Sequence, residues 1–354
     1  MTQGFHRITA ALALGLILAA GSARAEEAAP INIQITAANG KVTDSVYVPP
    51  KAAKKPWRIA ILIPHLKDPY WLAASYGAMD ESKRLGIKAE LLAAQGYTDI
   101  TGQLNQLDNV VAEGVNAIVL APIGSHAEVQ KVNQIIAKGI PVIDLINPLA
   151  SEKVTAKRLV SYRVAANLAG QYLRRTVGAA KANVAVFPGP AGSGWAEDML
   201  DGFKEAIHDR PNIKIIATKW GDTGKDVQMT LLQNVLQANP DVNYIVGNPV
   251  AASAAVNVLA QLGLSQKVKI ISLIDSSPVV NYIKVGKIAM TPTDYTVQLG
   301  RLGIDAAVDK LDGRKIDFHT GTKLGEITNG NIGSFVWQST FAPNGYSPVF
   351  KVNW

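Results

Sequence analysis

The feature that most constrains this chain is a regular alternation of short apolar segments with longer amphipathic ones. In the first half, the apolar segments predicted to be strands are 58–63, 88–92, 117–121 and 141–145. Segments with helical spacing of apolar residues lie between them, at about 70–85, 100–113 and 125–138. Short, nearly continuous apolar strands separated by helices are typical of a parallel sheet covered on both faces. This half is therefore predicted to be an α/β lobe.

The alternation starts again after residues 158–162. A helix is predicted at about 165–177, and the strands predicted after it are 183–187, 214–218, 244–246, 269–272 and 287–292. Further helices are predicted near 197–208, 225–238, 251–262 and 297–311. Each series is long enough to build its own core. The fold class predicted for the chain is therefore α/β, with two doubly wound parallel-sheet lobes.

The predicted organisation has four parts. Residues 1–25 are expected to be a signal peptide, and 26–56 an N-terminal arm with two possible short strands. Residues 57–162 plus about 295–354 are assigned to an N-terminal lobe, with a tail that contributes to that lobe alone or to both. Residues 163–294 are assigned to a C-terminal lobe.

The first 25 residues have the layout of an export signal. The apolar run 8–20 is too short to span a membrane, and Ala23-Arg24-Ala25 gives an A-x-A cleavage pattern. A retained amphipathic anchor is the alternative interpretation. We expect cleavage after Ala25 and a soluble mature protein in the periplasm, because no later run of about 18 apolar residues follows.

Composition excludes several functions. The chain has no cysteine, which rules out disulfides, thiol catalysis and thiolate metal sites. The formal charge is +7, and removing Arg7 and Arg24 with the signal leaves 7 − 2 = +5. Because no stripe of Lys and Arg interleaved with aromatics occurs, no nucleic-acid partner is expected.

Ligands of doubly wound sheets bind outside the carboxyl ends of the strands. Aromatic, acidic and amide side chains gather at these positions, and two of them fall where the chain changes lobes. The candidate ligand-binding residues are Asp68, Tyr70, Trp71, Tyr97, Tyr162, Asn248, Asp275 and Asp294. For Tyr70 and Trp71 the alternative is packing at a helix start, and for Asp294 it is capping of the next helix. Trp195, Trp220 and Asp222 are expected at most at the mouth of the cleft.

No enzyme motif is found, so no catalytic residue, metal site or cofactor is predicted. The segment Pro188–Trp195, "PGPAGSGW", is glycine-rich and lies between a strand and a helix. Its backbone amides suit either an anion or a tight turn, and it lacks the lysine of a P-loop. The histidines outside the predicted signal are scattered: His65, His126, His208 and His319.

Several motifs carry a resemblance to the type I periplasmic binding proteins. They are "LKDPYWLAASYGAMDESKRLG", "QGYTDITGQLNQLDN", "FPGPAGSGWAEDMLDGFKEAI" and "FAPNGYSPVF". The resemblance covers nearly all of the predicted mature chain and implies two lobes, joined by three crossovers, that close on a small molecule. It is sharpest to the branch of this family that senses trimethylamine N-oxide and acts with a membrane sensor histidine kinase.

The resemblance also implies roles for individual residues. Asp68, Tyr70 and Trp71 match the branch's D-x-Y-W loop, Tyr97 matches its G-Y motif, and Tyr162 stands where the branch has a tryptophan at the first crossover. This implies an aromatic-lined site for the N-oxide and the periplasmic domain of a kinase as partner.

Two departures favour the sugar-binding branch. Ile274 and Asp275 stand where an aromatic is expected, and Asn248 replaces a smaller hydroxyl residue. The alternative function is therefore the solute receptor of a sugar or polyol ABC importer, with a permease as partner.

Overall fold

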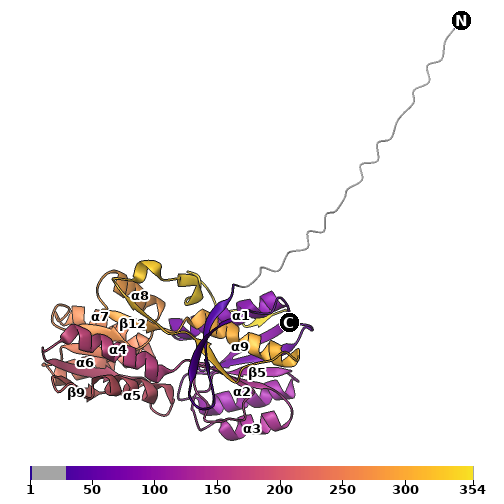
Figure 1. Cartoon of the computed structure of the whole chain (residues 1–354), viewed down its shortest axis with the longest axis horizontal. Coiled ribbons are helices and arrows are strands. Elements are labelled where there is room, and N and C mark those ends of the chain that lie inside the picture. Colours follow the sequence, from indigo (N-terminus) through magenta and orange to yellow (C-terminus); the bar gives the residue numbers. More distant parts are fainter. Residues whose placement is uncertain (2–28, 354) are drawn as a thin grey trace.

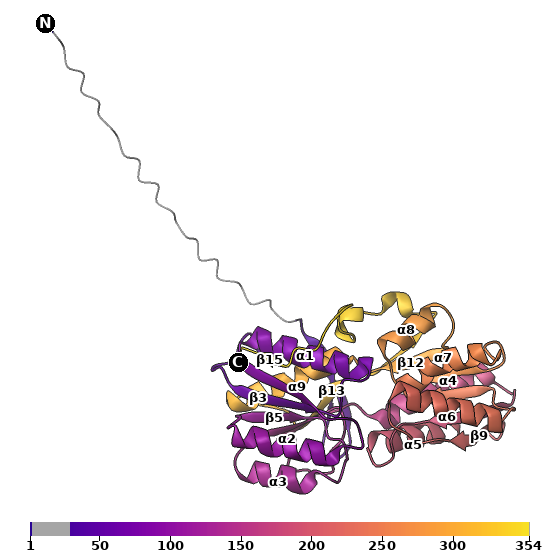
Figure 2. The same ribbon diagram turned by 180° about the vertical axis from the view of Figure 1, so that it is seen from behind.

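The computed structural model describes residue 1 and residues 29–353, so the predicted signal peptide falls outside the described residues except for Met1. The chain forms two α/β lobes that lie side by side (Figures 1 and 2). One lobe contains a nine-stranded sheet and the other a six-stranded sheet. The predicted α/β class with two doubly wound lobes is confirmed.

The nine-stranded sheet has the strand order β15-β4-β3-β5-β6-β7-β13-β1-β2. Its strands are β1 (Ile31–Thr36), β2 (Val42–Tyr47), β3 (Arg58–Ile63), β4 (Lys88–Ala93), β5 (Ala117–Leu120), β6 (Val142–Leu145), β7 (Ala156–Arg158), β13 (His319–Thr322) and β15 (Lys351–Val352). The strands from β4 to β13 run parallel, and the others pair antiparallel at the edges. The arm predicted to pack outside thus adds a β1–β2 hairpin to this sheet.

The six-stranded sheet has the order β14-β12-β11-β10-β8-β9. Its strands are β8 (Ala182–Phe187), β9 (Ile213–Thr218), β10 (Tyr244–Gly247), β11 (Lys269–Ser272), β12 (Met290–Thr293) and β14 (Gly325–Thr328). In each sheet the first strand of the α/β series, β3 or β8, lies between the second and third. The strand order therefore reverses beside β3 and beside β8, and such switch points are where doubly wound sheets bind ligands.

Pairs of helices cover both faces of both sheets (Figure 1). The helices of the first lobe are α1 (Pro69–Leu85), α2 (Ile100–Ala112), α3 (Val129–Ala137) and α9 (Thr296–Leu311). Those of the second are α4 (Tyr162–Val177), α5 (Trp195–Ile207), α6 (Lys225–Ala238), α7 (Pro249–Gln261) and α8 (Ser277–Lys284). Within the described part of the chain, every helix is too short or too polar to span a bilayer.

The chain passes between the lobes at the predicted three crossovers, β7 to α4, β12 to α9 and β13 to β14. The tail adds a return passage. Its short helices η1 (Ile332–Ser334) and η2 (Trp337–Ser339) pack beside the core of the second lobe, and β15 then pairs with β4 of the first.

Helix α1 is placed by its ends and by small residues on its inner face. The Asp68 side chain accepts the Trp71 N–H at 3.0 Å, and Gly86 ends the helix in the left-handed conformation. A Cβ on Gly77 would lie 2.1 Å from the Val297 carbonyl oxygen. The missing side chain thus lets α1 and α9 pack closely, which fixes the start of α1 against the crossovers.

Two element boundaries differ from the predictions. Helix α3 begins at Val129 rather than near 125, because the Glu128 carboxylate turns back to accept the Ile123 N–H at 3.1 Å. Strand β12 begins at Met290 rather than 287, because the N–H of Lys287 and that of Ile288 both donate to the Tyr282 carbonyl in the turn after α8.

Candidate functional site: an aromatic cavity between the lobes

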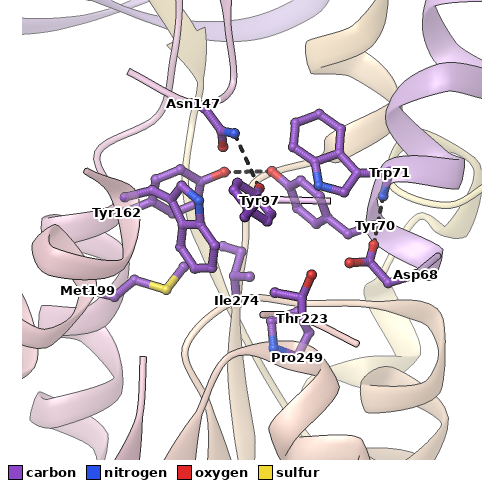
Figure 3. A pocket seen from close by; sticks show the side chains of 11 residues that line it. Asp68, Tyr70, Trp71, Tyr97, Asn147, Tyr162, Met199, Thr223, Pro249 and Ile274 are labelled. Atoms are coloured by element: carbon purple, nitrogen blue, oxygen red, sulfur yellow. Dashed lines mark hydrogen bonds between the residues drawn. The ribbon is translucent and has the colours of Figure 1, made fainter. Parts of the chain in front are cut away.

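A cavity of about 30 Å³ lies where the carboxyl ends of the two sheets meet (Figure 3). Both lobes contribute to its wall. The residues that line it are Asp68, Tyr70, Trp71, Tyr97, Asn147, Tyr162, Trp195, Met199, Thr223, Pro249 and Ile274. Each lies in the loop after a parallel strand or in the first two turns of the helix that follows, and Tyr162 does so at the first crossover.

The structure brings five of the eight candidate residues into this wall: Asp68, Tyr70, Trp71, Tyr97 and Tyr162. The rings also contact one another. Tyr70 meets Trp71 edge-on with 5.7 Å between ring centroids, and Tyr97 lies 5.7 Å from Trp195 of the other lobe. The Asp68 carboxylate also caps α1 while it faces the cavity.

The other three candidates do not line the cavity. Asn248 is fully buried and caps α7: its Oδ1 accepts the N–H groups of Val250 and Ala251, and its Nδ2 donates to the Phe187 carbonyl. Asp294 and Asp275 are also fully buried, behind the wall. Asp294 accepts from Tyr70 and from the Thr296 hydroxyl, so it serves both the cavity and the start of α9.

A chain of hydroxyl groups connects the cavity to two crossovers. The Tyr70 hydroxyl donates to Asp294 Oδ2 at 2.6 Å and lies 2.7 Å from the Tyr162 hydroxyl (Figure 3 shows the Tyr70–Tyr162 bond). Because the Tyr70 proton is committed to Asp294, Tyr162 is the donor to Tyr70. Burial raises the pKa of Asp294 to about 6, against the lowering effect of the Tyr70 and Thr296 hydrogen bonds.

Asp275 is the least satisfied polar group next to the site. Neither of its carboxylate oxygens has a hydrogen-bond partner that meets ordinary geometry. Burial, and then the charge of Asp294, raise the pKa of Asp275 well above its ordinary value. The pair therefore holds a proton at neutral pH, because two carboxylates this deeply buried do not both ionise.

Sequence reasoning did not single out Asn147, which lies in a strained turn. Ile146 has φ of 63°, and the Asn147 N–H donates to the Leu145 carbonyl two residues back at 2.6 Å. A γ-turn with positive φ at a β-branched residue is rare and costly. It directs the Asn147 amide to the Tyr97 hydroxyl at 3.2 Å and the Pro122 carbonyl at 2.8 Å.

Trp195 was expected at the mouth of the cleft, but it lies in the cavity wall. The glycine-rich loop before it makes this possible. Gly189 has φ of 141°, and a Cβ there would lie 2.4 Å from the Trp195 ring. Ile274 lines the cavity at the position where the resemblance implies an aromatic. Met199, Thr223 and Pro249 gave no signal of their own in the sequence, since each is of a type common in cores or turns.

The backbone N–H groups of the glycine-rich segment Pro188–Trp195 bind a side chain of the protein itself. Glu197 Oε1 accepts the Gly192 N–H at 2.6 Å, and Oε2 accepts the Gly194 N–H at 2.8 Å. A side chain of the protein thus occupies the position that an anion would take. The tight-turn interpretation of the glycine-rich segment is the one that the structure supports.

Hydrogen-bond donors surround the Tyr97 hydroxyl. Burial raises the pKa of Tyr97, and hydrogen bonds from Asn147 and from the indole groups of Trp71 and Trp195 oppose that shift. The Trp195 indole N–H is buried without a partner of good geometry. This side of the cavity therefore offers N–H and O–H groups to an acceptor. Among the described residues, no cluster of three or more His, Asp or Glu side chains is placed to hold a metal ion.

Two α/β lobes that enclose a small cavity at their carboxyl ends define a two-lobe receptor for a small solute. A family model described as "Periplasmic binding protein domain" matches residues 59–315. The chain belongs to the periplasmic binding protein family, whose members are ligand receptors and not enzymes. The sequence-based resemblance to its type I members is confirmed.

Several relatives are similar over most of the chain. Periplasmic protein TorT of Escherichia coli K12 is 29% identical over 302 residues, 85% of this chain and 86% of TorT. TorT in a complex with the TorS sensor domain, in the presence of TMAO, is 28% identical with a TM-score of 0.74, covering 83% of this chain and 99% of that one.

A solute-binding protein of an ABC transporter from Bradyrhizobium sp. BTAi1, with bound bis-tris, is 38% identical with a TM-score of 0.78, covering 91% of this chain and 98% of that one. The D-allose-binding periplasmic protein of Escherichia coli K12 is 23% identical over 265 residues, 73% of this chain and 85% of that protein.

Proposed function

We propose that this chain is an exported periplasmic receptor that binds trimethylamine N-oxide or a closely related small solute, and that it reports the ligand to a membrane sensor histidine kinase. The observation that carries the proposal is the cavity, with five aromatic rings drawn from both lobes. We further propose that the lobes follow the boundaries predicted from the sequence and that Asp68, Tyr70, Trp71, Tyr97 and Tyr162 contact the ligand.

The chemistry of the wall suits the two ends of an amine oxide. The methylated nitrogen carries formal positive charge, and aromatic faces attract such a centre by about 0.5–2 kcal/mol per ring. The Asp68 carboxyl lies on the same wall. Burial raises its pKa, His65 and the hydrogen bonds from Trp71 and Thr223 oppose that shift, and its ionised form adds a negative charge beside the cationic end of the ligand. The oxide is an acceptor without protons, and the indole N–H of Trp195, which lacks a protein partner of good geometry, supplies a donor.

The same wall is poorly suited to a sugar. A hexose presents several hydroxyl groups that each require a partner, because a buried polar group without one costs about 1–3 kcal/mol. Asp68, Asn147 and Thr223 are the polar non-aromatic residues of the wall, and all three already bond to protein groups. A cavity of about 30 Å³ also favours a solute of few atoms.

The ligands named for two relatives agree with this choice. TMAO and bis-tris both contain a nitrogen that bears three carbon substituents, although bis-tris also carries hydroxyl groups. A receptor that recognises the substituted nitrogen by aromatic contact would accommodate this class. We therefore place tertiary amine oxides and tertiary amines ahead of sugars as ligands.

For the partner, the support is the complex of TorT with the TorS sensor domain. The alternative is the permease of an ABC importer. It is favoured by the Bradyrhizobium relative and by Asp275, a buried carboxyl without a hydrogen-bond partner directly after the lining residue Ile274. A cavity that opened as far as Asp275 would gain a hydroxyl-binding group.

Titration calorimetry tests the ligand. We expect the wild type to release heat with trimethylamine N-oxide and little with D-allose. Trp195→Leu should weaken binding of the N-oxide about tenfold, because it removes one ring and one donor. Trp220→Leu is the matched control, since Trp220 is 36% exposed and does not line the cavity. Absence of heat and of a thermal shift with every amine oxide and amine would refute the ligand class.

A further inference from the structure

Three buried residues beside the aromatic rings connect the two lobes: His65, Asp68 and Thr223. His65 and Asp68 belong to the loop after β3, and Thr223 belongs to the loop after β9. His65 Nε2 lies 3.0 Å from Thr223 Oγ1, and the Thr223 hydroxyl hydrogen-bonds the Asp68 carboxylate. The three residues are between 1% and 5% exposed, so water does not compete for these bonds.

The directions of these hydrogen bonds follow from one fixed donor. The Lys67 N–H donates to His65 Nδ1 at 3.3 Å, so the neutral ring carries its proton on Nε2. His65 Nε2–H then donates to Thr223 Oγ1, and the Thr223 proton goes to Asp68. The hydroxyl is thus both acceptor and donor, and each of its bonds reaches across to the opposite lobe.

We propose that Thr223 is the positioning residue that latches the lobes closed over the cavity, and that protonation of the buried His65 weakens this closure. The proposal concerns closure of the site and rests on the proposed receptor function for its biological meaning.

A protonated His65 still donates from Nε2 to Thr223, but it loses the Lys67 contact and places a positive charge in a buried loop. Both ring nitrogens would then be donors, and Nδ1–H would face the Lys67 N–H, which is also a donor. The charged groups around the ring are Asp68 and Asp222, which favour protonation, and Lys67, which opposes it. Trp71 and Tyr97 pack edge-on against the ring at 6.4 and 5.5 Å. Burial is the largest influence and lowers the pKa of His65.

The sign of the pH effect follows. When the lobes part, His65 meets water and its pKa returns toward about 6.5. Closure is therefore fully favoured above that pH and weakens as the pH falls below it, because opening takes up a proton. The closed-to-open ratio should fall by up to about tenfold per pH unit in that range.

The absence of cysteine allows a direct measurement of closure. Asn105→Cys on α2 and Lys225→Cys on α6 replace exposed residues on opposite lobes, and a donor–acceptor dye pair there reports the lobe separation. Energy transfer is measured between pH 7.5 and 5.0, without ligand and with trimethylamine N-oxide. Circular dichroism confirms that each variant is folded.

Two substitutions separate the latch from general structure. Thr223→Val keeps the shape and removes the hydroxyl, and should lower the closed-to-open ratio about tenfold at neutral pH. His65→Gln places an amide N–H close to the Nε2 position and does not titrate, so it should keep closure at neutral pH and lose the pH dependence.

The outcomes are distinct. If Thr223→Val closes like the wild type with the same pH profile, or if His65→Gln keeps the wild-type profile, the latch is refuted. If trimethylamine N-oxide changes nothing in any variant while the ligand-free pH response behaves as described, the latch stands and the proposed ligand fails.

Discussion

Removal of a single oxygen atom tests how the site is anchored to the crossovers. Tyr70→Phe leaves the ring in the cavity wall but deletes the hydroxyl that donates to Asp294 and accepts from Tyr162. At alkaline pH the bond to Asp294 involves a carboxylate, and hydrogen bonds to charged groups are worth about 1.5–3 kcal/mol. Tyr162 also loses its acceptor. We expect a loss of about 3 kcal/mol in the free energy of unfolding at pH 8.

The loss should be smaller in acid. Burial holds the pKa of Asp294 at about 6 in the folded protein, above the ordinary value of 3.8. A carboxyl whose pKa is raised in the folded state favours folding when it is protonated. Its contribution to the free energy of unfolding is therefore lost as the pH rises from 3.8 through about 6. Deleting the Tyr70 hydroxyl removes a group that lowers this pKa, so the variant's pKa rises further. The free energies of unfolding of the wild type and of Tyr70→Phe therefore differ most above pH 6.

Differential scanning calorimetry at pH 5 and pH 8 measures both values. For lobes of this size, about 3 kcal/mol corresponds to a fall in Tm of roughly 8 °C at pH 8, and about 1 kcal/mol to roughly 3 °C at pH 5. Tyr172→Phe on α4 is the control, because Tyr172 is half-buried and lies outside the cavity. Equal Tm shifts for the two variants, or a Tyr70→Phe shift that does not change with pH, would refute the reasoning.

Two further predictions concern carboxyl groups that accept backbone N–H groups. Glu197→Gln removes one of the two oxygens that accept the loop amides of Gly192 and Gly194, so we expect a loss of about 1–2 kcal/mol and weaker ligand binding, measured by thermal unfolding and calorimetry. Glu205→Gln, which affects only the exposed pair with Arg163, should stay close to the wild type. Burial raises the pKa of Asp144 to about 8, so Asp144→Asn should stabilise the protein by an amount that grows from pH 4 to pH 8, on the order of 2 kcal/mol at neutral pH. Urea unfolding measures this gain. An equal gain in the free energy of unfolding at pH 4 and pH 8 would show that it does not come from the raised pKa of Asp144.

The sequence predicted the fold well because its signals are physical and local. Apolar strands between amphipathic helices are compatible with few other arrangements. The rule that ligands bind at the carboxyl ends of strands then located Tyr70, Trp71 and Tyr97 without knowledge of side-chain positions. The pattern could not show whether a polar side chain at such a position faces the cavity or bonds to the protein's own backbone. Asn248 follows a strand and has a side chain suited to a ligand, but its amide oxygen caps the start of α7.

The residues missed by the prediction depend on backbone detail. The position of Asn147 follows from the positive φ of Ile146, and the sequence gives no sign that an isoleucine adopts it. Trp195 reaches the cavity because Gly189 leaves space for its ring, whereas the same glycine-rich segment equally suggested an anion site. Such positions follow from steric contacts between segments, which no periodicity encodes.

Two groups of hydrogen-bonded side chains border the cavity. They should affect stability and lobe closure differently, because one lies close to the crossovers and the other lies away from them. Tyr162 and Asp294 lie at two of the crossovers, where little moves when lobes rotate about them, and Tyr70 on α1 hydrogen-bonds to both. His65, Asp68 and Thr223 lie on the side where Lys67 and Asp222 meet across the gap at 3.5 Å, with Lys67 half exposed. A ligand shifts the open–closed equilibrium only by its difference in affinity for the two states. We expect the group of Tyr70, Tyr162 and Asp294 to persist in both states and therefore to set stability. Under the proposed latch, the Thr223 group forms only on closure and adds to the free energy that favours the closed state. Tyr70→Phe should accordingly lower Tm with little change in the closed fraction. Thr223→Val should lower the closed fraction with little change in Tm.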